Sequence, residues 1–165
     1  MQKQSLGIKS VATLHLMVGL PCSGKTTLAR QLEQEHSALR LTPDEWQVAL
    51  FGQDAEEPEH DARHSLIETM FWKIASRALE LGTNVILDFG FWAREEREDY
   101  RLRAKDLGAS SEVHFLDVPK EELLRRLAVR NSQPSRESFH ISEESMLPWI
   151  EFFQSPTLEE LERKE

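Results

Sequence analysis

The sequence predicts an α/β fold in three layers, with a parallel sheet of four to five strands and helices on both faces. Short apolar runs alternate with longer segments of helical period, which is typical of a parallel sheet covered by helices. Apolar residues make up 39% of the chain and charged residues 30%, which describes a globular protein. The 165 residues fit one domain, because compact domains cluster around ~100–150 residues. We expect a single domain over residues 1–165, with residues 1–10 flexible and residues 131–142 forming a lid loop.

The first apolar run, residues 12–18, predicts a strand, and a turn leads from it into a helix over 24–35. A weaker apolar run predicts a second strand over 38–41. The next four residues, Thr-Pro-Asp-Glu at 42–45, place Thr at an N-cap, Pro at the first helical position and Glu at N3. This pattern predicts a capping box that starts a short helix ending near residue 50.

A polar loop over 52–59 leads to a long helix over 61–81, with Gly82 as its stop. The apolar residues of this helix recur at spacings near 3.6, which predicts the buried stripe Leu66, Met70, Ile74 and Leu81. The run over 84–89 is almost continuously apolar, as in a central parallel strand that is buried on both faces.

The last third of the chain continues this alternation. We expect a charged helix over 94–107, a strand over 113–118, a helix over 119–130, an exposed loop over 131–142, a helix over 146–153 and a frayed tail from Thr157. In an open parallel sheet, ligands bind beyond the carboxyl ends of the strands. Polar residues that directly follow a strand are therefore the first candidates for function.

The charge balance limits the possible partners. The chain has 29 Asp+Glu against 20 Lys+Arg and a formal net charge of −9, which argues against a broad phosphate-binding surface. The single Cys excludes a disulfide framework and a cysteine-built zinc site, and it indicates a reducing compartment. Because no export signal and no apolar segment of ~20 residues is present, we expect a cytoplasmic protein without a membrane partner. We also expect a monomer or homodimer.

Residues 19–26, Gly-Leu-Pro-Cys-Ser-Gly-Lys-Thr, fit the phosphate-binding pattern G-x-x-x-x-G-K-[ST] between a strand and a helix. Backbone N–H groups of such a loop surround phosphate oxygens, and the positive end of the following helix favours their charge. We expect Lys25 to reach the β- and γ-phosphates of ATP and the Thr26 hydroxyl to bind Mg²⁺. The expected nucleotide-binding residues are Gly19, Pro21, Cys22, Ser23, Gly24, Lys25, Thr26 and Thr27. The alternatives are a Gly-rich turn without a ligand and, for Cys22, a thiol whose oxidation blocks the nucleotide.

Two carboxylates follow expected strands. Asp88 ends the run Val-Ile-Leu as a Walker-B acid does, which predicts contact with Mg²⁺ or an acceptor hydroxyl; a loop cap is the alternative. Asp44 could take the proton of an attacking hydroxyl. It could instead stabilise its own helix by ~0.3–1 kcal/mol as an acid in the first turn. Asp117 also ends a strand, but Pro119 soon follows it, which favours a structural role.

Arginines supply the expected cations. Arg126 and Arg130 lie four residues apart on one helix face, where they could close over the transferred phosphate and exclude water. The alternative is a solvated face paired with neighbouring glutamates. Arg94 and Arg97 follow the third strand and either hold the acceptor or lie on the surface.

The six His form no metal-ligand spacing except His60 and His64, at i and i+4. With no carboxylate motif between them, we interpret this pair as a solvated helix face. Trp46 and Trp92 lie near strand ends, where they could pack against an acceptor.

Together these motifs resemble the small P-loop kinases of the AAA_33 type, a family related to the kinase half of phage polynucleotide kinase, to chloramphenicol phosphotransferase and to zeta-type toxins. The resemblance covers residues 14–153, and its most specific elements are Gly-Leu-Pro-Cys-Ser-Gly-Lys-Thr-Thr, Thr-Pro-Asp-Glu-Trp, Val-Ile-Leu-Asp and Phe-Leu-Asp-Val-Pro. It implies that Asp44 is the general base, Asp88 a second active-site acid and Arg130 a lid arginine that contacts the phosphates. The nucleic-acid kinases carry Arg three residues after the base, where this chain has Gln47.

The whole sequence thus predicts a P-loop kinase that uses ATP and Mg²⁺ to phosphorylate a hydroxyl group of a small molecule. Gln47 in place of arginine and the charge of −9 favour a small acceptor over a nucleic acid. The expected acceptor-binding residues are Asp44, Gln47, Asp88, Arg94 and Arg97. Two alternatives stay open: a nucleic-acid 5′-hydroxyl kinase, and an ATP-binding regulatory or toxin-like module with slow ATPase activity. We expect specificity to come from residues 52–59, 91–97 and 131–142.

Overall fold

A computed structural model describes residues 10–133 and 135–162. At its centre lies a parallel sheet with the strand order β2-β3-β1-β4. The strands are β1 (Thr13–Val18), β2 (Leu39–Leu41), β3 (Val85–Gly90) and β4 (Ser110–Phe115). The predicted α/β fold with a parallel sheet is confirmed, and the sheet has four strands within the described residues.

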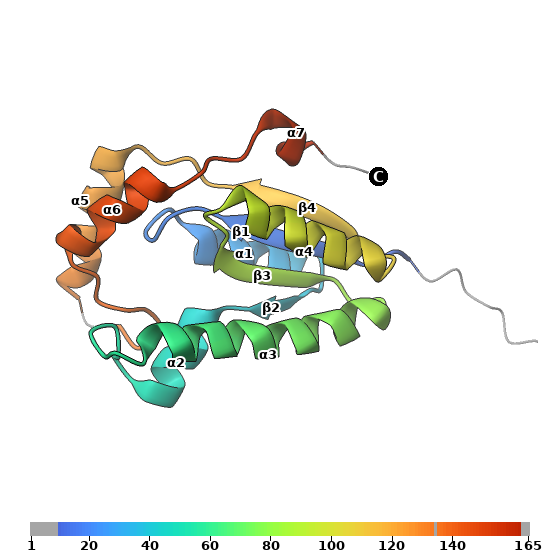
Figure 1. The fold of residues 1–165 in the computed structure, drawn as a ribbon, viewed down its shortest axis with the longest axis horizontal. Coiled ribbons are helices and arrows are strands. Elements are labelled where there is room, and N and C mark those ends of the chain that lie inside the picture. Colours follow the sequence, from blue (N-terminus) through green and yellow to red (C-terminus); the bar gives the residue numbers. More distant parts are fainter. Residues whose placement is uncertain (1–9, 134, 163–165) are drawn as a thin grey trace, which may run out of the picture.

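Helices cover both faces of this sheet, as predicted (Figure 1). They are α1 (Lys25–Glu35), α2 (Pro43–Phe51), α3 (His60–Glu80), α4 (Arg94–Asp106), α5 (Lys120–Asn131), α6 (Glu143–Phe152) and α7 (Leu158–Leu161). The main core cluster joins the sheet to α3 and α4, and a second cluster joins the opposite face to α1. A third cluster packs α5 and α6 against Leu20, in the loop that follows β1.

The central strands are buried on both faces because neighbouring side chains alternate between the two helical layers. In β1, Leu14 and Leu16 belong to the cluster with α3 and α4, whereas Met17 belongs to the cluster with α1. Every residue of β1 is buried. This placement brings the loop after β1 to the carboxyl edge of the sheet, beside the ends of β2 and β3.

The apolar stripe predicted for the long helix is not the one that packs against the sheet. The side chains of Leu66, Met70, Ile74 and Leu81 are between 40% and 59% exposed. The residues of α3 that face the sheet are Ile67, Phe71, Ala75 and Leu79, each at most 5% exposed. Two apolar stripes run side by side on this helix, and packing against the sheet selects the one that carries Phe71.

Three further elements differ from the sequence prediction. α6 begins at Glu143, three residues before the expected start. β4 begins three residues early, because the backbone of Ser110 pairs with Thr13 although its side chain is polar. The tail predicted to fray from Thr157 forms α7, in which Thr157 and Glu160 make a capping box. Glu160 is only 5% exposed.

Each helix within 10–133 and 135–162 is too short or too polar to cross a membrane. The prediction of flexibility for residues 1–10 concerns a segment that, except for Ser10, lies outside the described residues.

Candidate active site

The phosphate-binding loop lies between β1 and α1, and it is held by short backbone contacts. The N–H of Gly19 donates to the carbonyl of Gly90 at 3.0 Å, which ties the loop to the end of β3. A Cβ at position 19 would lie 2.5 Å from Ser23 Oγ and 3.3 Å from Ser23 Cβ, so a side chain there would displace Ser23. Gly24 has φ 95° and leads into α1, whose first turn has no side-chain cap. The N–H groups of this turn therefore remain available for an anion.

Lys25 lies at the centre of this loop. Its ammonium donates to the carbonyl of Leu20 at 3.0 Å. Burial lowers the pKa of Lys25, and the negative charges of Asp88 and Asp44 oppose this effect. The three side chains are therefore close enough to interact electrostatically, although 63 positions separate Lys25 from Asp88.

Asp88 accepts hydrogen bonds from two threonine hydroxyls of other elements. Thr26 Oγ1 donates to Asp88 Oδ2 at 2.7 Å, and Thr42 Oγ1 donates to the same oxygen at 3.1 Å. Burial raises the pKa of Asp88, and the charge of Lys25 opposes it. Within the described residues, Asp88 Oδ1 is buried and has no hydrogen-bond partner. A carboxylate oxygen beside a threonine hydroxyl is a donor set that suits Mg²⁺, so Thr26 and Asp88 fit this ion.

Thr42 was expected to cap α2, but its hydroxyl makes no cap hydrogen bond. It donates to Asp88 and accepts from Arg40 Nη1 at 2.7 Å. The predicted capping box is therefore wrong, and Thr42 is a site residue that sequence reasoning missed. Its position directly after a parallel strand was the available signal.

Asp44 lies in the first turn of α2 and faces the same cleft as Lys25 and Asp88. Its side chain is 46% exposed, and its Oδ1 lies 4.0 Å from His64 Nδ1. The cleft has a volume of about 860 Å³. Ligand pockets typically measure ~300–1,000 Å³, so the cleft can hold a small molecule.

The guanidinium groups of Arg126 and Arg130 lie beside the phosphate loop, and Arg126 also pairs with Glu122 at 2.9 Å, as the solvated-face alternative expected. Arg126 Nη1 donates to the carbonyl of Cys22 at 3.3 Å, and Arg130 Nη1 lies 3.6 Å from Cys22 Sγ. Arg130 Nη2 donates to the carbonyl of Phe139 at 2.6 Å. Both guanidinium groups are thus beside the loop, and Arg130 also links it to the segment after α5.

The sequence model of AAA_33, an AAA domain, matches residues 14–156. The chain belongs to the AAA_33 family. No curated protein matches it in sequence.

Solved structures share the fold of this AAA_33 chain. A chain in a structure of the Pnkp1/Rnl/Hen1 RNA repair complex superposes with a TM-score of 0.70 at 22% identity, over 90% of this chain and 46% of its own length. Kti12 of Chaetomium thermophilum, in complex with ADP-AlF3, gives 0.63 at 24% identity, over 87% of this chain and 81% of its own. A candidate kinase from Chloroflexus aurantiacus gives 0.71 at 19% identity, over 87% and 79%. The AAA_33 chain thus has a P-loop kinase fold, and it spans less than half of the RNA-repair neighbour.

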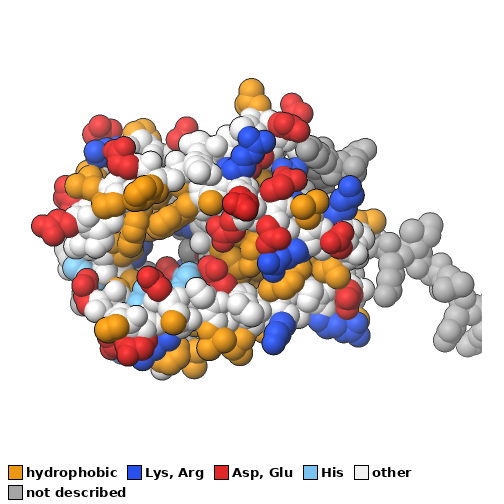
Figure 2. Space-filling view, viewed as in Figure 1, with side chains coloured by type: hydrophobic (Ala, Val, Ile, Leu, Met, Phe, Trp, Pro, Cys, Tyr) orange, Lys and Arg blue, Asp and Glu red, His pale blue; other side chains and the backbone are white. Residues whose placement is uncertain are grey.

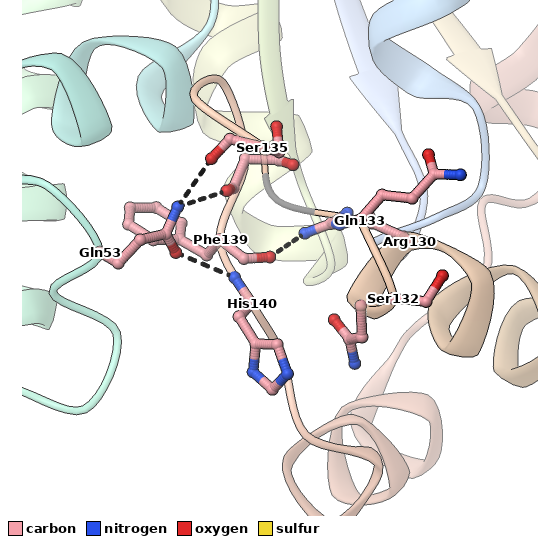
Figure 3. Close-up of a pocket in the computed structure, with 9 residues that line it drawn as sticks. Gln53, Arg130, Ser132, Gln133, Ser135, Phe139 and His140 are labelled. Carbon is pink, nitrogen blue, oxygen red and sulfur yellow. Dashed lines mark hydrogen bonds between the residues drawn. The ribbon is translucent and has the colours of Figure 1, made fainter.

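The segment after α5 in the AAA_33 chain is joined to the loop after α2 (Figure 3). The Gln53 amide donates to the carbonyls of Ser135 and Ser138 at 3.2 and 2.8 Å, and its oxygen accepts from His140 N at 3.1 Å. Together with Arg130, these residues line a smaller pocket of about 360 Å³ beside the main cleft. Two of the three segments expected to set specificity are therefore in direct contact.

Three predicted acceptor-binding residues, Arg94, Arg97 and Gln47, do not line the cleft. Arg97 is fully buried, and its guanidinium pairs with Glu160 at 2.8 Å and donates to the carbonyls of Phe91 and Gln154. This contradicts an acceptor contact, because those groups occupy its donors. Arg94 has an exposed side chain outside the cleft lining.

Gln47 is fully buried as well. Its amide donates to both carboxylate oxygens of Asp54, at 3.1 and 3.2 Å, and to the carbonyl of His60. The predicted contact of Gln47 with the acceptor is contradicted, because Gln47 instead positions the loop after α2. The solvated face predicted for His60 and His64 is also wrong, since both rings are partly buried and line the cleft.

Several carboxylates of the cleft were not foreseen. Asp61, Glu68 and Glu96 line it from α3 and α4, and Figure 2 shows Asp, Glu and His side chains gathered beside the hollow above α3. Burial, followed by the charge of Glu68, raises the pKa of Glu96 to about 7. Burial alone would lower the pKa of His64, but its hydrogen bond and charge interaction with Glu68 raise it. This wall of the cleft is acidic. Asp61 and Glu96 lie in the first turns of α3 and α4, where acids are common, and Glu68 lies within α3. The sequence therefore offers no signal to separate them from a solvated helix face.

Proposed function

We propose that this AAA_33 protein transfers the γ-phosphoryl group of ATP, with Mg²⁺, to a hydroxyl group of a small neutral or cationic molecule. The observation that carries the proposal is the position of Asp44, a half-exposed carboxylate that shares the cleft with Lys25 and the Thr26–Asp88 pair. A kinase needs a carboxylate that accepts the proton of the attacking hydroxyl while cations hold the transferred phosphoryl group.

Each element of the cleft has a role in this proposal. The N–H groups of the loop and Lys25 hold the β- and γ-phosphates. Thr26 and Asp88 hold Mg²⁺, which neutralises charge on the phosphates. Asp44 accepts the proton of the acceptor hydroxyl, and Arg130 stabilises the charge of the transferred group while the segment after α5 excludes water.

The charge of the cleft supports a small acceptor. Of its cationic side chains, Arg30 is neutralised by Glu45 and Glu137 at 3.0 and 2.6 Å, which leaves Lys25 and Arg130 at the phosphate loop. The wall formed by α3 and α4 offers only carboxylates and histidine as charged groups. A nucleic acid would bring its phosphates against this wall, where like charges repel and where no Lys or Arg replaces the counterions.

The test is a screen for acceptor-dependent ADP release with small alcohols, amino alcohols, sugars, nucleosides and 5′-hydroxyl oligonucleotides. For the best acceptor, Asp44→Asn should lower kcat by about 10²–10⁴-fold and leave the Kd for ATP within about twofold. Asp117→Asn is the matched control, because Asp117 is an exposed aspartate outside the cleft lining. Wild-type turnover in Asp44→Asn would refute the role of Asp44 as base.

A nucleic-acid 5′-hydroxyl kinase is the second candidate, because two neighbours come from Pnkp1/Rnl/Hen1 complexes, one of them 26% identical over 80% of this chain with a TM-score of 0.61. In that case the oligonucleotides would be the best acceptors in the screen, and their binding would weaken steeply with salt. If ADP is released slowly and no acceptor accelerates the release, the protein is instead an ATP-binding module with slow ATPase activity.

A further inference from the structure

A cluster of histidine and carboxylate side chains lies outside the cleft, on the face of the sheet that packs against α1. His15 in β1 is 1% exposed, and Glu112 and His114 are partly buried in the edge strand β4. β1 and β4 pair in parallel with His15 opposite Glu112. Because side chains two residues apart point to the same face of a strand, Glu112 and His114 both lie beside His15.

The ligand atoms of this cluster lie within reach of one another. His15 Nδ1 lies 2.9 Å from His114 Nε2, and His114 Nε2 lies 3.8 Å from Glu112 Oε1. One ligand atom from each of the three residues lies within 4.8 Å of the others. In a tetrahedral Zn²⁺ site with bonds of ~2.0–2.2 Å, neighbouring ligand atoms are ~3.3 Å apart. These two separations lie on either side of this value, and the ligand atoms of His15 and Glu112, within 4.8 Å of each other, must also approach for all three residues to share one ion.

The donor types select the ion. Two imidazole nitrogens and one carboxylate oxygen suit first-row transition metals, whereas Mg²⁺ prefers oxygen donors and keeps several waters. In the contact between His15 and His114, one nitrogen carries the shared proton and the other presents its lone pair. Binding one ion through both nitrogens therefore requires that proton to move to the other nitrogen of its own ring, which leaves each imidazole neutral and able to bind a metal. His36, at the C-terminal end of α1, stacks on His15 with ring centroids 4.9 Å apart and covers the cluster.

We propose that His15, Glu112 and His114 form a Zn²⁺ site, separate from the Mg²⁺ site of the phosphate loop. The ion would join the central strand β1 to the edge strand β4, with the fourth coordination position taken by water. The proposal does not depend on the kinase function, because none of the three residues lines the cleft.

The experiment uses the full chain after chelator treatment and dialysis. Zn²⁺ is titrated by calorimetry in excess MgCl₂, and Co²⁺ is added to a second sample to record its visible absorption bands. We expect one Zn²⁺ per chain, Co²⁺ bands of a four- or five-coordinate site, and a higher Tm with Zn²⁺. Removing even an outer-shell partner of a metal typically weakens binding by ~10–100-fold, so His114→Ala and Glu112→Gln should each weaken it by about 100-fold or more.

Two controls separate this site from other histidines. His64→Ala removes the pair between His64 Nε2 and Glu68 Oε1 in the cleft, which are 3.0 Å apart, and His140→Ala removes an exposed histidine. Both should bind Zn²⁺ as the wild type does. Circular dichroism before titration verifies that each variant is folded. If His114→Ala does not fold, Glu112→Gln still provides the test. Unchanged Zn²⁺ affinity in the folded β4 variants, or its loss in His64→Ala, would overturn the proposal.

Discussion

Glu160 provides the sharpest test of how the structure holds together. Its carboxylate accepts from Arg97 Nε at 2.8 Å and from Thr157 N at 2.8 Å, and both Arg97 and Glu160 are at most 5% exposed. In Glu160→Gln the buried guanidinium loses its counter-charge but keeps a neutral acceptor. Breaking a buried pair in this way costs ~3–5 kcal/mol, and we expect the lower end, about 3 kcal/mol, because a hydrogen bond remains.

The assay is urea unfolding followed by tryptophan fluorescence at pH 7, together with a thermal melt. For a domain of this size, 1 kcal/mol corresponds to ~2–4 °C, so the Tm should fall by about 6–12 °C. Glu151→Gln, an exposed glutamate in α6, is the matched control and should change the stability by less than about 0.5 kcal/mol.

Acid provides an independent check on the same pair. Burial alone would raise the pKa of Glu160, but the hydrogen bond and charge of Arg97 overcome it and lower the pKa in the folded chain. A lowered carboxylate pKa stabilises the fold above the unfolded pKa of ~4.5, and this stabilisation is lost as the pH falls through the folded value. The difference in unfolding free energy between wild type and Glu160→Gln should therefore shrink below pH 4.5. A difference under 1 kcal/mol at pH 7, or one that acid leaves unchanged, would refute the reasoning.

The other predictions concern the cleft. Lys25→Ala should lower kcat for the best acceptor by at least about 10²-fold in the ADP-release assay, because it removes a cation from the transferred phosphoryl group. Gly19→Ala should weaken ATP binding at least tenfold by calorimetry, because its Cβ would lie 2.5 Å from Ser23 Oγ and distort the loop. The pKa of Glu96 is raised to about 7 in the folded chain. The folded chain therefore binds the carboxyl proton of Glu96 more tightly than the unfolded chain does. Its contribution to the free energy of unfolding is complete below pH ~4.5 and is lost as the pH rises through 7. Glu96→Gln should remove that loss between pH 5 and 8 in urea unfolding, and an unchanged slope would contradict it.

The parts of the site that follow from local patterns were predictable from the sequence. The phosphate loop is one continuous segment after a strand, and Asp88 ends an apolar run, so neither depends on distant partners. Thr42 was misread because the hydroxyl partner that replaces its cap, Asp88, lies 46 positions away in the chain. The sequence pattern at 42–45 favours a hydrogen bond from Thr42 within its own helix. In the fold, the Asp88 carboxylate takes the Thr42 hydroxyl instead.

Arg97 was misread for the same physical reason, a partner that is distant in the sequence. It lies in the charged run Arg-Glu-Glu-Arg-Glu, which resembles a solvated helix face, and its counter-ion Glu160 is 63 positions away in a tail expected to fray. The prediction of which face of α3 is buried was wrong for a different reason. Helical period identifies stripes of apolar residues, but only contact with the sheet decides whether the stripe of Leu66 or that of Phe71 is buried.

The Arg97–Glu160 pair also bears on where the functional unit ends. The family match stops at residue 156, before α7, yet Glu160 is the buried counter-ion of Arg97. Arg97 in turn donates to the carbonyl of Phe91, and the next residue, Trp92, donates from its indole N–H to the carbonyl of Gly19 in the phosphate loop at 3.2 Å. A continuous set of contacts therefore runs from α7 to the loop. A chain cut at residue 156 would bury an uncompensated guanidinium behind the turn that carries Trp92, so α7 supports the turn that contacts the phosphate-binding loop.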